Sequence, residues 1–140
     1  MADNSLLFRS WKNDKGSVVK FNEGKQLSQS SWEILGEYQT AVGNAPSQSY
    51  PLRGICQRLE KTDVNVVENK VEFLVSFCVQ WTELKDPEKP KSGTAWSGQV
   101  IWDEENQRYL MSTLWVLTSK HLFHNVWKAT TIEKDIFLPL

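Results

Sequence analysis

The chain carries almost no excess of charge of either sign, and it has no long apolar run. Its 16 Lys and Arg residues nearly balance 17 Asp and Glu residues, which gives a formal net charge of −1. A nucleic-acid or anionic-membrane partner would need a basic patch, so neither is expected. No stretch approaches about 18 apolar residues, so no transmembrane helix is expected. Residues 1–11 lack a basic region followed by an apolar stretch, and we expect no signal peptide in this sequence.

Cysteine is scarce, and the sequence lacks an Asn-x-Ser/Thr acceptor site. The alternation described below places Cys56 and Cys78 on opposite faces of neighbouring strands. A disulfide between strands needs facing Cβ atoms, so two small buried thiols are favoured over a bridge. Without an acceptor site, N-glycosylation is not expected.

Helical periodicity is also nearly absent, and alternation of apolar and polar residues takes its place. Residues 71–81 show this clearly, because every second residue from Val71 to Trp81 is apolar or aromatic. Alternation with turn residues about every 10 to 20 positions predicts an all-β fold. We expect strands over residues 5–12, 17–22, 32–42, 51–60, 71–81, 93–102, 108–118 and 127–138.

The connections between the expected strands are short, and no internal repeat or linker interrupts the 140 residues. A chain of this length predicts a single domain over residues 1–140. Eight antiparallel strands joined in sequence favour an up-and-down β-barrel with one apolar interior. Such a barrel is wide enough to hold one small ligand.

The face opposite the aromatic stripe is partly apolar as well. Cys78, Leu114, Val116, Ile132 and Ile136 are expected to point outward. An exposed apolar patch of this kind marks an interface. The sequence therefore predicts an oligomer.

Single polar side chains fall within the expected interior. Asn13, Ser17 and Tyr38 offer donors, and a buried donor left unpaired costs about 1–3 kcal/mol. They suit a ligand carbonyl oxygen that can carry negative charge. Asp135 and Thr40, expected opposite them, accept hydrogen bonds from N–H groups. Three donors facing two acceptors match a cyclic urea.

Other interior residues fit the remainder of such a ligand. Thr94 can add a weak hydrogen bond to a sulfur atom. Trp81, Trp96 and Trp115 can wall the apolar part of the ligand. A tryptophan-rich core is the alternative explanation for the seven tryptophans of the chain.

Several short motifs occur in a shared order over most of the chain. They are S-W-K-N-D-x-G-S at 10–17, G-x-Y-x-T-A-V-G-N-A at 36–45, P-L-x-G at 51–54, V-Q-W at 79–81, S-G-T-A-W-S-G-Q at 92–99, T-L-W-V-L-T-S at 113–119, N-V-W-K-A-T at 125–130 and D-I-F at 135–137. This order resembles the avidin and streptavidin family of biotin-binding proteins, whose fold is a streptavidin-like barrel.

The resemblance implies high-affinity, non-catalytic binding of biotin in the open end of the barrel, with no cofactor. It implies a homo-oligomer, either a tetramer or a dimer, in which Trp127 is lent to a neighbouring subunit. It also implies a secreted, extracellular protein. The biotin-binding residues that it implies are Asn13, Ser17, Tyr38, Thr40, Asn44, Ala45, Trp81, Ser92, Thr94, Trp96, Trp115, Trp127 and Asp135.

Two residues depart from the family pattern. Pro46 follows the carboxylate-binding residues Asn44 and Ala45, and it removes an N–H group from that loop. Lys134 is expected on the outward face, where lysines of two packed subunits would repel each other. The order of the oligomer is therefore left open.

Three other functions were considered. A lipocalin-like carrier of another small apolar ligand would share the barrel, but it does not need six convergent polar groups. An enzyme is not expected, because no cysteine and histidine share a motif that would activate a nucleophile. His121 and His124 lack further zinc ligands, so no metal is expected. A purely structural interaction module explains the outward apolar face but not the inward polar residues.

Overall fold

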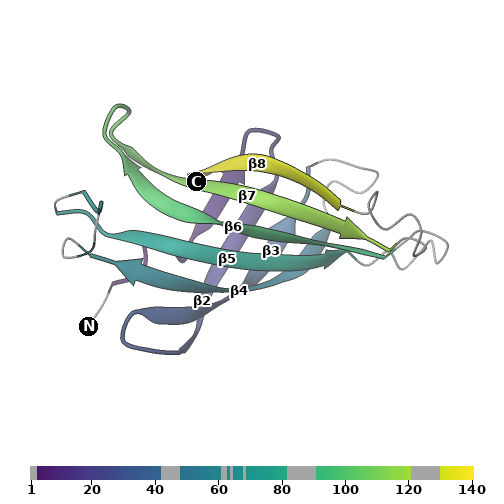
Figure 1. The fold of residues 1–140 in the computed structure, drawn as a ribbon, viewed down its shortest axis with the longest axis horizontal. Coiled ribbons are helices and arrows are strands. Elements are labelled where there is room, and N and C mark those ends of the chain that lie inside the picture. The colour runs from purple at the N-terminus through teal and green to yellow at the C-terminus, as the bar shows by residue number, and fades with distance from the viewer. Residues whose placement is uncertain are drawn as a thin grey trace.

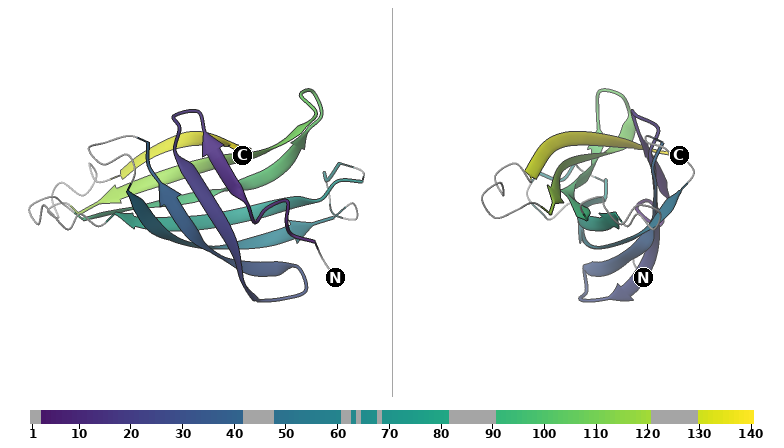
Figure 2. Two further views of the ribbon diagram at one scale, coloured as in Figure 1. Left: turned by 180° about the vertical axis from the view of Figure 1, so that it is seen from behind. Right: turned by 90° about the vertical axis from the view of Figure 1, so that its right-hand side faces the viewer.

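Eight strands form one closed barrel in the computed structural model, which describes residues 3–41, 48–60, 63, 65–67, 69–81, 91–120 and 130–140. Each strand pairs antiparallel with the next one in the sequence, and the last closes on the first (Figures 1 and 2). The expected all-β, up-and-down architecture is confirmed. The strands are β1 (Ser10–Asn13), β2 (Val18–Gln26), β3 (Ser31–Gln39), β4 (Ser49–Leu59), β5 (Glu72–Trp81), β6 (Ser92–Asp103), β7 (Arg108–Ser119) and β8 (Thr130–Pro139).

Two strand boundaries differ by four residues or more from those expected. β1 begins at Ser10 rather than at residue 5, because the N–H groups of Leu7 and Phe8 donate to the carbonyl of Asn4 and curl this segment into a turn. β2 runs on to Gln26, where a turn was expected. Its last residues are polar and mostly exposed, so they lack the alternation that would have shown the strand. The expected start of the eighth strand, residues 127–129, lies outside the described residues.

The expected alternation is confirmed along β5. Phe73, Val75, Phe77 and Val79 are buried, whereas the intervening side chains from Leu74 to Gln80 are exposed. The buried apolar residues form one core. Removing their apolar surface from water stabilises the fold by about 25 cal/mol per Å². The members of this core are Leu7, Trp11, Val19, Phe21, Trp32, Ile34, Tyr38, Leu52, Cys56, Phe73, Val75, Phe77, Val79, Trp96, Val100, Met111 and Phe137.

One residue at the start of β5 breaks the alternation. Glu72 was expected on the outward face, but the structure buries it. Its Oε2 accepts a hydrogen bond of 2.8 Å from the backbone N–H of Trp102. This bond compensates a buried carboxylate that would otherwise be costly, so Glu72 joins β5 to the far end of β6.

The N-terminal segment fills the end of the barrel at which β5 begins (Figure 1). Leu7 is fully buried, and its carbonyl accepts a 3.0 Å hydrogen bond from Nε1 of Trp11. Arg58, on the strand next to the start of β5, donates to the carbonyl of Asp3 at 2.6 Å and to the side chain of Asn4 at 3.2 Å. These contacts close one end and leave the interior accessible from the other.

The outward face carries the apolar residues that the sequence predicted there. Leu114, Ile132 and Ile136 are 52%, 58% and 39% exposed. Cys78 is exposed on this face and Cys56 is buried, and both are free thiols. The expected absence of a bridge is confirmed, but the expectation that both thiols are buried is wrong for Cys78, because its strand position points away from the core.

Close strand packing requires glycine at position 98. An added Cβ would overlap the carbonyl oxygen of Ser112 and would lie 2.7 Å from the Cα of Thr113 on β7. A side chain there would push β6 and β7 apart. Within the described residues, no helix is long and apolar enough to span a membrane.

Candidate functional site

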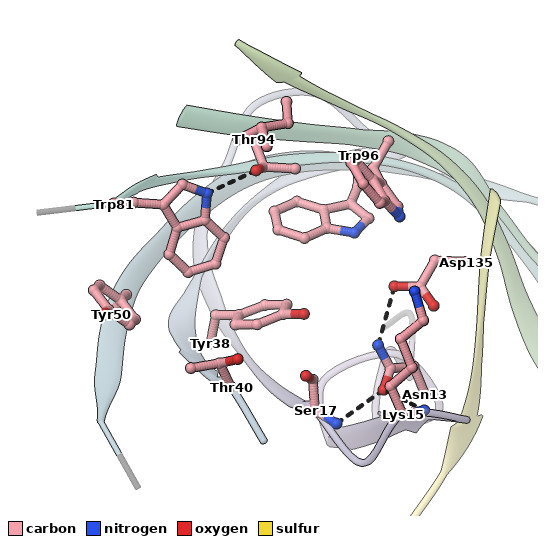
Figure 3. A pocket seen from close by; sticks show the side chains of 12 residues that line it. Asn13, Lys15, Ser17, Tyr38, Thr40, Tyr50, Trp81, Thr94, Trp96 and Asp135 are labelled. Carbon is pink, nitrogen blue, oxygen red and sulfur yellow. Dashed lines mark hydrogen bonds between the residues drawn. The ribbon is translucent and has the colours of Figure 1, made fainter. Parts of the chain in front are cut away.

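A cavity of about 350 Å³ lies inside the barrel at the end opposite the N-terminal segment. Figure 3 shows the side chains that line it. Most of the strands, together with the turn between β1 and β2, contribute to its wall. The residues lining it are Asn13, Lys15, Ser17, Tyr38, Thr40, Tyr50, Trp81, Thr94, Trp96, Trp115, Leu117 and Asp135.

Nine of the residues proposed from the sequence line this cavity: Asn13, Ser17, Tyr38, Thr40, Trp81, Thr94, Trp96, Trp115 and Asp135. Ser92 does not line it. It lies at the start of β6, in register with Ser119, and borders a separate outer depression that includes Lys91 and Lys120. The remaining three, Asn44, Ala45 and Trp127, lie outside the described residues.

The turn after β1 fixes the orientation of the Asn13 amide. Its Oδ1 accepts hydrogen bonds from the backbone N–H groups of Lys15, at 3.1 Å, and Ser17, at 2.8 Å. Such local bonds are typical of asparagine in turns. Gly16 completes the turn with a φ of 89°, which favours glycine. With its oxygen occupied, the amide presents its Nδ2 donors to the cavity.

Asp135 lies beside Asn13 rather than opposite it. Nδ2 of Asn13 donates to Oδ2 of Asp135 at 3.1 Å, which corrects the sequence-based placement of this donor and acceptor on facing walls (Figure 3). The backbone carbonyl of Asp135 accepts from Oγ1 of Thr113 at 2.8 Å, which ties β8 to β7 at this point. The Asn13 amide therefore retains one N–H for a ligand, and Asp135 retains lone pairs.

Burial shapes the electrostatics of Asp135. It is 7% exposed, and desolvation raises the pKa of its carboxyl above the ordinary value of 3.8. The hydrogen bond from Asn13 and the charge of Lys15 lower the pKa and offset part of this effect, whereas Asp14 adds to it. A donor brought to Asp135 would stabilise its carboxylate form, because hydrogen bonds to a charged acceptor are strong.

Tyr38 and Ser17 form a second polar pair in the cavity. Burial raises the pKa of the Tyr38 phenol, and hydrogen bonding with Ser17 opposes that rise. Oγ of Ser17 also accepts from the backbone N–H of Ala41 at 3.3 Å. Both hydroxyl groups are therefore neutral at pH 7 and can donate a hydrogen bond to an acceptor in the cavity.

Aromatic rings form the apolar wall. Tyr38 stacks on Trp96 with centroids 5.1 Å apart, and Trp96 stacks on Phe77 at 5.0 Å. Trp81 meets the edge of Tyr38 at 5.3 Å. Its Nε1 donates to Oγ1 of Thr94 at 2.7 Å, which fixes the indole orientation. These contacts build a rigid wall before any ligand arrives.

The indole N–H of Trp96 is a buried donor without a hydrogen-bond partner in the described part of the chain. It faces Asp135 closely enough to lower the carboxyl pKa, but it makes no hydrogen bond of normal geometry with it. An unpaired buried donor costs about 1–3 kcal/mol. A polar group that enters the cavity can relieve this cost.

Three lining residues were not proposed from the sequence. Leu117 shares the alternation of Trp115 within the expected strand 108–118, but its apolar side chain gave no chemical signal. Tyr50, whose ring meets Trp81 at 5.0 Å, precedes the expected start of its strand by one residue. Lys15 lies between the proposed site residues Asn13 and Ser17, and this position in the sequence could have indicated that it lines the cavity.

The described residues do not include a group of three or more His, Cys, Asp or Glu side chains that could hold a metal ion. The pair His121 and His124 lies outside the described residues. The cavity instead combines fixed hydrogen-bonding groups with an aromatic wall. This arrangement can bind a small molecule that has one polar end and an apolar body.

Comparison with known proteins agrees with this geometry. A sequence model described as the Avidin family matches residues 1–140. The fold is similar to that in a structure described as the crystal structure of Xenavidin, with a TM-score of 0.68 and 23% sequence identity. The alignment covers 99% of this chain and 100% of that chain. The likeness shows an avidin-like, eight-stranded closed barrel.

Proposed function

Because the chain belongs to the avidin family, a family of non-catalytic binding proteins, we propose that it binds biotin without turnover. The observation that carries the proposal is the cavity in which Asn13, Ser17, Tyr38 and Asp135 meet beside stacked aromatic rings. Its volume of about 350 Å³ lies in the range of small-molecule sites, roughly 300–1,000 Å³. The family membership favours biotin over the small apolar ligand of a lipocalin-like carrier.

In the proposed complex the urea oxygen accepts hydrogen bonds from Asn13, Ser17 and Tyr38. Asp135 accepts from one urea N–H, and Thr40 accepts from the other. Because Asp135 is charged, it polarises the urea toward the oxygen, where the donors stabilise negative charge. The indole N–H of Trp96 is a further donor without a partner among the described residues. It favours a ligand that carries hydrogen-bond acceptors over a purely hydrocarbon one.

The body of biotin fits the aromatic part of the wall. Trp81, Trp96 and Trp115 contact the fused rings, and the hydroxyl of Thr94 donates to the sulfur while its oxygen accepts from Trp81. Hydrogen bonds and ring stacking already hold these groups in place. Little conformational entropy is then lost on binding, which favours high affinity.

We further infer that the outward apolar face assembles with other copies of the chain. Leu114 and Ile132 are more than half exposed, which is costly in a monomer. In this proposal the homo-oligomer is a tetramer, with a dimer as the alternative, and Trp127 of one subunit covers the cavity of its neighbour. Asn44, Ala45 and Ser92 would hold the carboxylate tail at the rim.

Calorimetry tests the ligand. Biotin should bind once per chain, and desthiobiotin, which keeps the urea but lacks the sulfur, should bind more weakly. A long-chain fatty acid serves as the control for a general apolar carrier and should give no competition. If biotin gives neither heat nor a thermal shift, the proposal is wrong.

Sedimentation tests the shared tryptophan. Trp127→Lys should weaken both biotin binding and association, whereas Trp81→Ala should weaken binding with less effect on association. Biotin should stabilise the assembled form, because a ligand that binds it better shifts the equilibrium by mass action. A wild-type monomer that binds biotin tightly would refute the shared tryptophan and leave the urea site intact.

A further inference from the structure

The wall of the cavity is incomplete where the first and last strands meet. β1 has four residues, and β8 has ten. Their pairing covers Trp11–Asn13 against Phe137–Pro139 only. Beyond Asn13 the chain turns toward β2, so the part of β8 that carries Asp135 faces this turn rather than a paired strand. We call this gap the β1–β8 seam.

Side chains close the β1–β8 seam. The hydrogen bond between Asn13 and Asp135 spans it at 3.1 Å. One step nearer the mouth, Nζ of Lys15 lies 3.8 Å from Oε2 of Glu133. Both of these side chains are more than half exposed. An ion pair so placed adds little stability, so we expect Lys15 to act on the cavity rather than on folding.

The position of Lys15 gives it an electrostatic role. Among the described residues that line the cavity it is the only one with a positive charge, and it lies on the same side as Asn13 and Asp135 (Figure 3). Its charge lowers the pKa of Asp135, against the larger opposing effects of burial and of the Asp14 charge. Its backbone is fixed as well, because its N–H donates to Oδ1 of Asn13.

We propose that Lys15 is a positioning residue for the ligand acceptor: at the β1–β8 seam, on the same cavity wall as Asp135, its ammonium favours the ionised carboxylate beside the bound ring. This inference rests on the proposed biotin site. The titratable groups that act on Asp135 from the packed elements are Lys15 and Asp14 in the turn and Tyr38 on β3. Glu133 acts through its contact with Lys15. Of these groups, only Lys15 carries positive charge.

The charge state of Asp135 sets how the affinity depends on pH. An ionised Asp135 accepts from a ligand N–H, and a protonated one loses that capacity in part. Affinity is therefore complete above the pKa of Asp135 and falls as the pH drops through it. Removing the Lys15 cation raises that pKa, so the fall should begin at a higher pH.

The experiment measures the affinity of biotin amide between pH 3.5 and pH 8 (about the range spanning ordinary and raised carboxyl pKa values). The amide is uncharged, so the ligand contributes no titration. Lys15→Met keeps most of the side-chain length and removes the charge, and it should weaken binding at pH 5 about three- to tenfold more than at pH 8. A three- to tenfold change corresponds to about 0.7–1.4 kcal/mol. Lys15→Arg should restore the wild-type profile.

Controls separate this effect from others. Lys12→Met removes a nearby cation that does not line the cavity and should leave the profile unchanged. Added salt should shrink the difference between wild type and Lys15→Met, because exposed charges are screened. Tryptophan fluorescence at each pH shows that every variant stays folded.

The outcomes are distinct. If wild type fails to bind biotin amide at pH 8, the proposed function itself is wrong. If wild type binds and Lys15→Met has the same pH profile, the role of Lys15 is refuted while the biotin site stands. A Lys12→Met shift as large as that of Lys15→Met would also refute it, because the effect would then reflect overall charge.

Discussion

Replacing Asp135 separates ligand binding from the stability of the barrel. The carboxylate is 7% exposed, it accepts one hydrogen bond from Asn13, and burial raises its pKa. Its removal takes away a desolvated charge but leaves Nδ2 of Asn13 without its partner, so these effects offset each other and the stability of the unliganded protein should change little. The same removal takes away the acceptor for a ligand N–H. Asp135→Ala should therefore weaken biotin binding without lowering the melting temperature of the free protein.

The magnitude follows from the contacts that are lost. A hydrogen bond to a charged acceptor contributes about 1.5–3 kcal/mol, and a buried N–H left without a partner costs about 1–3 kcal/mol. These two contributions overlap, because both concern the same N–H group of the ligand. We therefore expect Asp135→Ala to lose about 2–4 kcal/mol of binding free energy. This is about 30- to 1,000-fold in the dissociation constant. Asp135→Asn keeps an acceptor oxygen and should lose about half as much free energy.

Competition calorimetry with desthiobiotin measures this difference even when biotin binds very tightly. Asp103→Asn is a suitable control, because this carboxyl lies at the tip of the β6–β7 hairpin and does not line the cavity. A loss under about 1 kcal/mol for Asp135→Ala, the range of an ordinary neutral hydrogen bond, would place Asp135 outside the site. A large drop in melting temperature would show that the carboxylate acts on folding rather than on the ligand.

Three further predictions concern acid, thiols and strand packing. Affinity for biotin amide should fall on acidification at a pH above the ordinary carboxyl value of 3.8, because burial raises the pKa of Asp135, and Asp135→Asn should not show this fall. A maleimide should modify Cys78 in dissociated subunits and less in the assembled form, whereas burial and a pKa raised to about 11 should protect Cys56 in both; modification of Cys56 in the folded protein would contradict its burial. Gly98→Ala should lower the free energy of unfolding by about 1–3 kcal/mol, measured by urea denaturation, because its Cβ meets backbone. Gly93→Ala should cost less, since its Cβ meets only the flexible side chain of Gln80, and equal losses would refute the packing argument.

The alternation of residues determined much of the fold. Phe73, Val75 and Phe77 are buried and Leu74 is exposed, as the period of two requires. This pattern depends on each strand alone, so it can be read without knowing which strands are neighbours. It also explains why most of the proposed cavity residues were found, since they occupy inward positions on their strands.

The local sequence did not predict which side chains are buried near the ends of the barrel, because burial there depends on neighbouring elements. Glu72 is buried because neighbouring elements cover it, and its position on β5 does not show this. Ser92 shares the inward parity of Thr94, yet at the first position of β6 it borders an outer depression rather than the described cavity. The alternation along a strand tells which way a side chain points, inward or outward. It does not tell how far the side chain lies from the open end of the barrel.

The sequence by itself determined the strands, their inward faces and the residue types that suit a cyclic urea. Only the tertiary structure decided which of those residues are neighbours. Asn13 and Asp135 are separated by 122 positions, and the closure of β8 on β1 brings their side chains to 3.1 Å. The same closure leaves the β1–β8 seam that Lys15 covers. Closure is a property of the whole barrel, because the tilt and register of all its strands set where the last one meets the first.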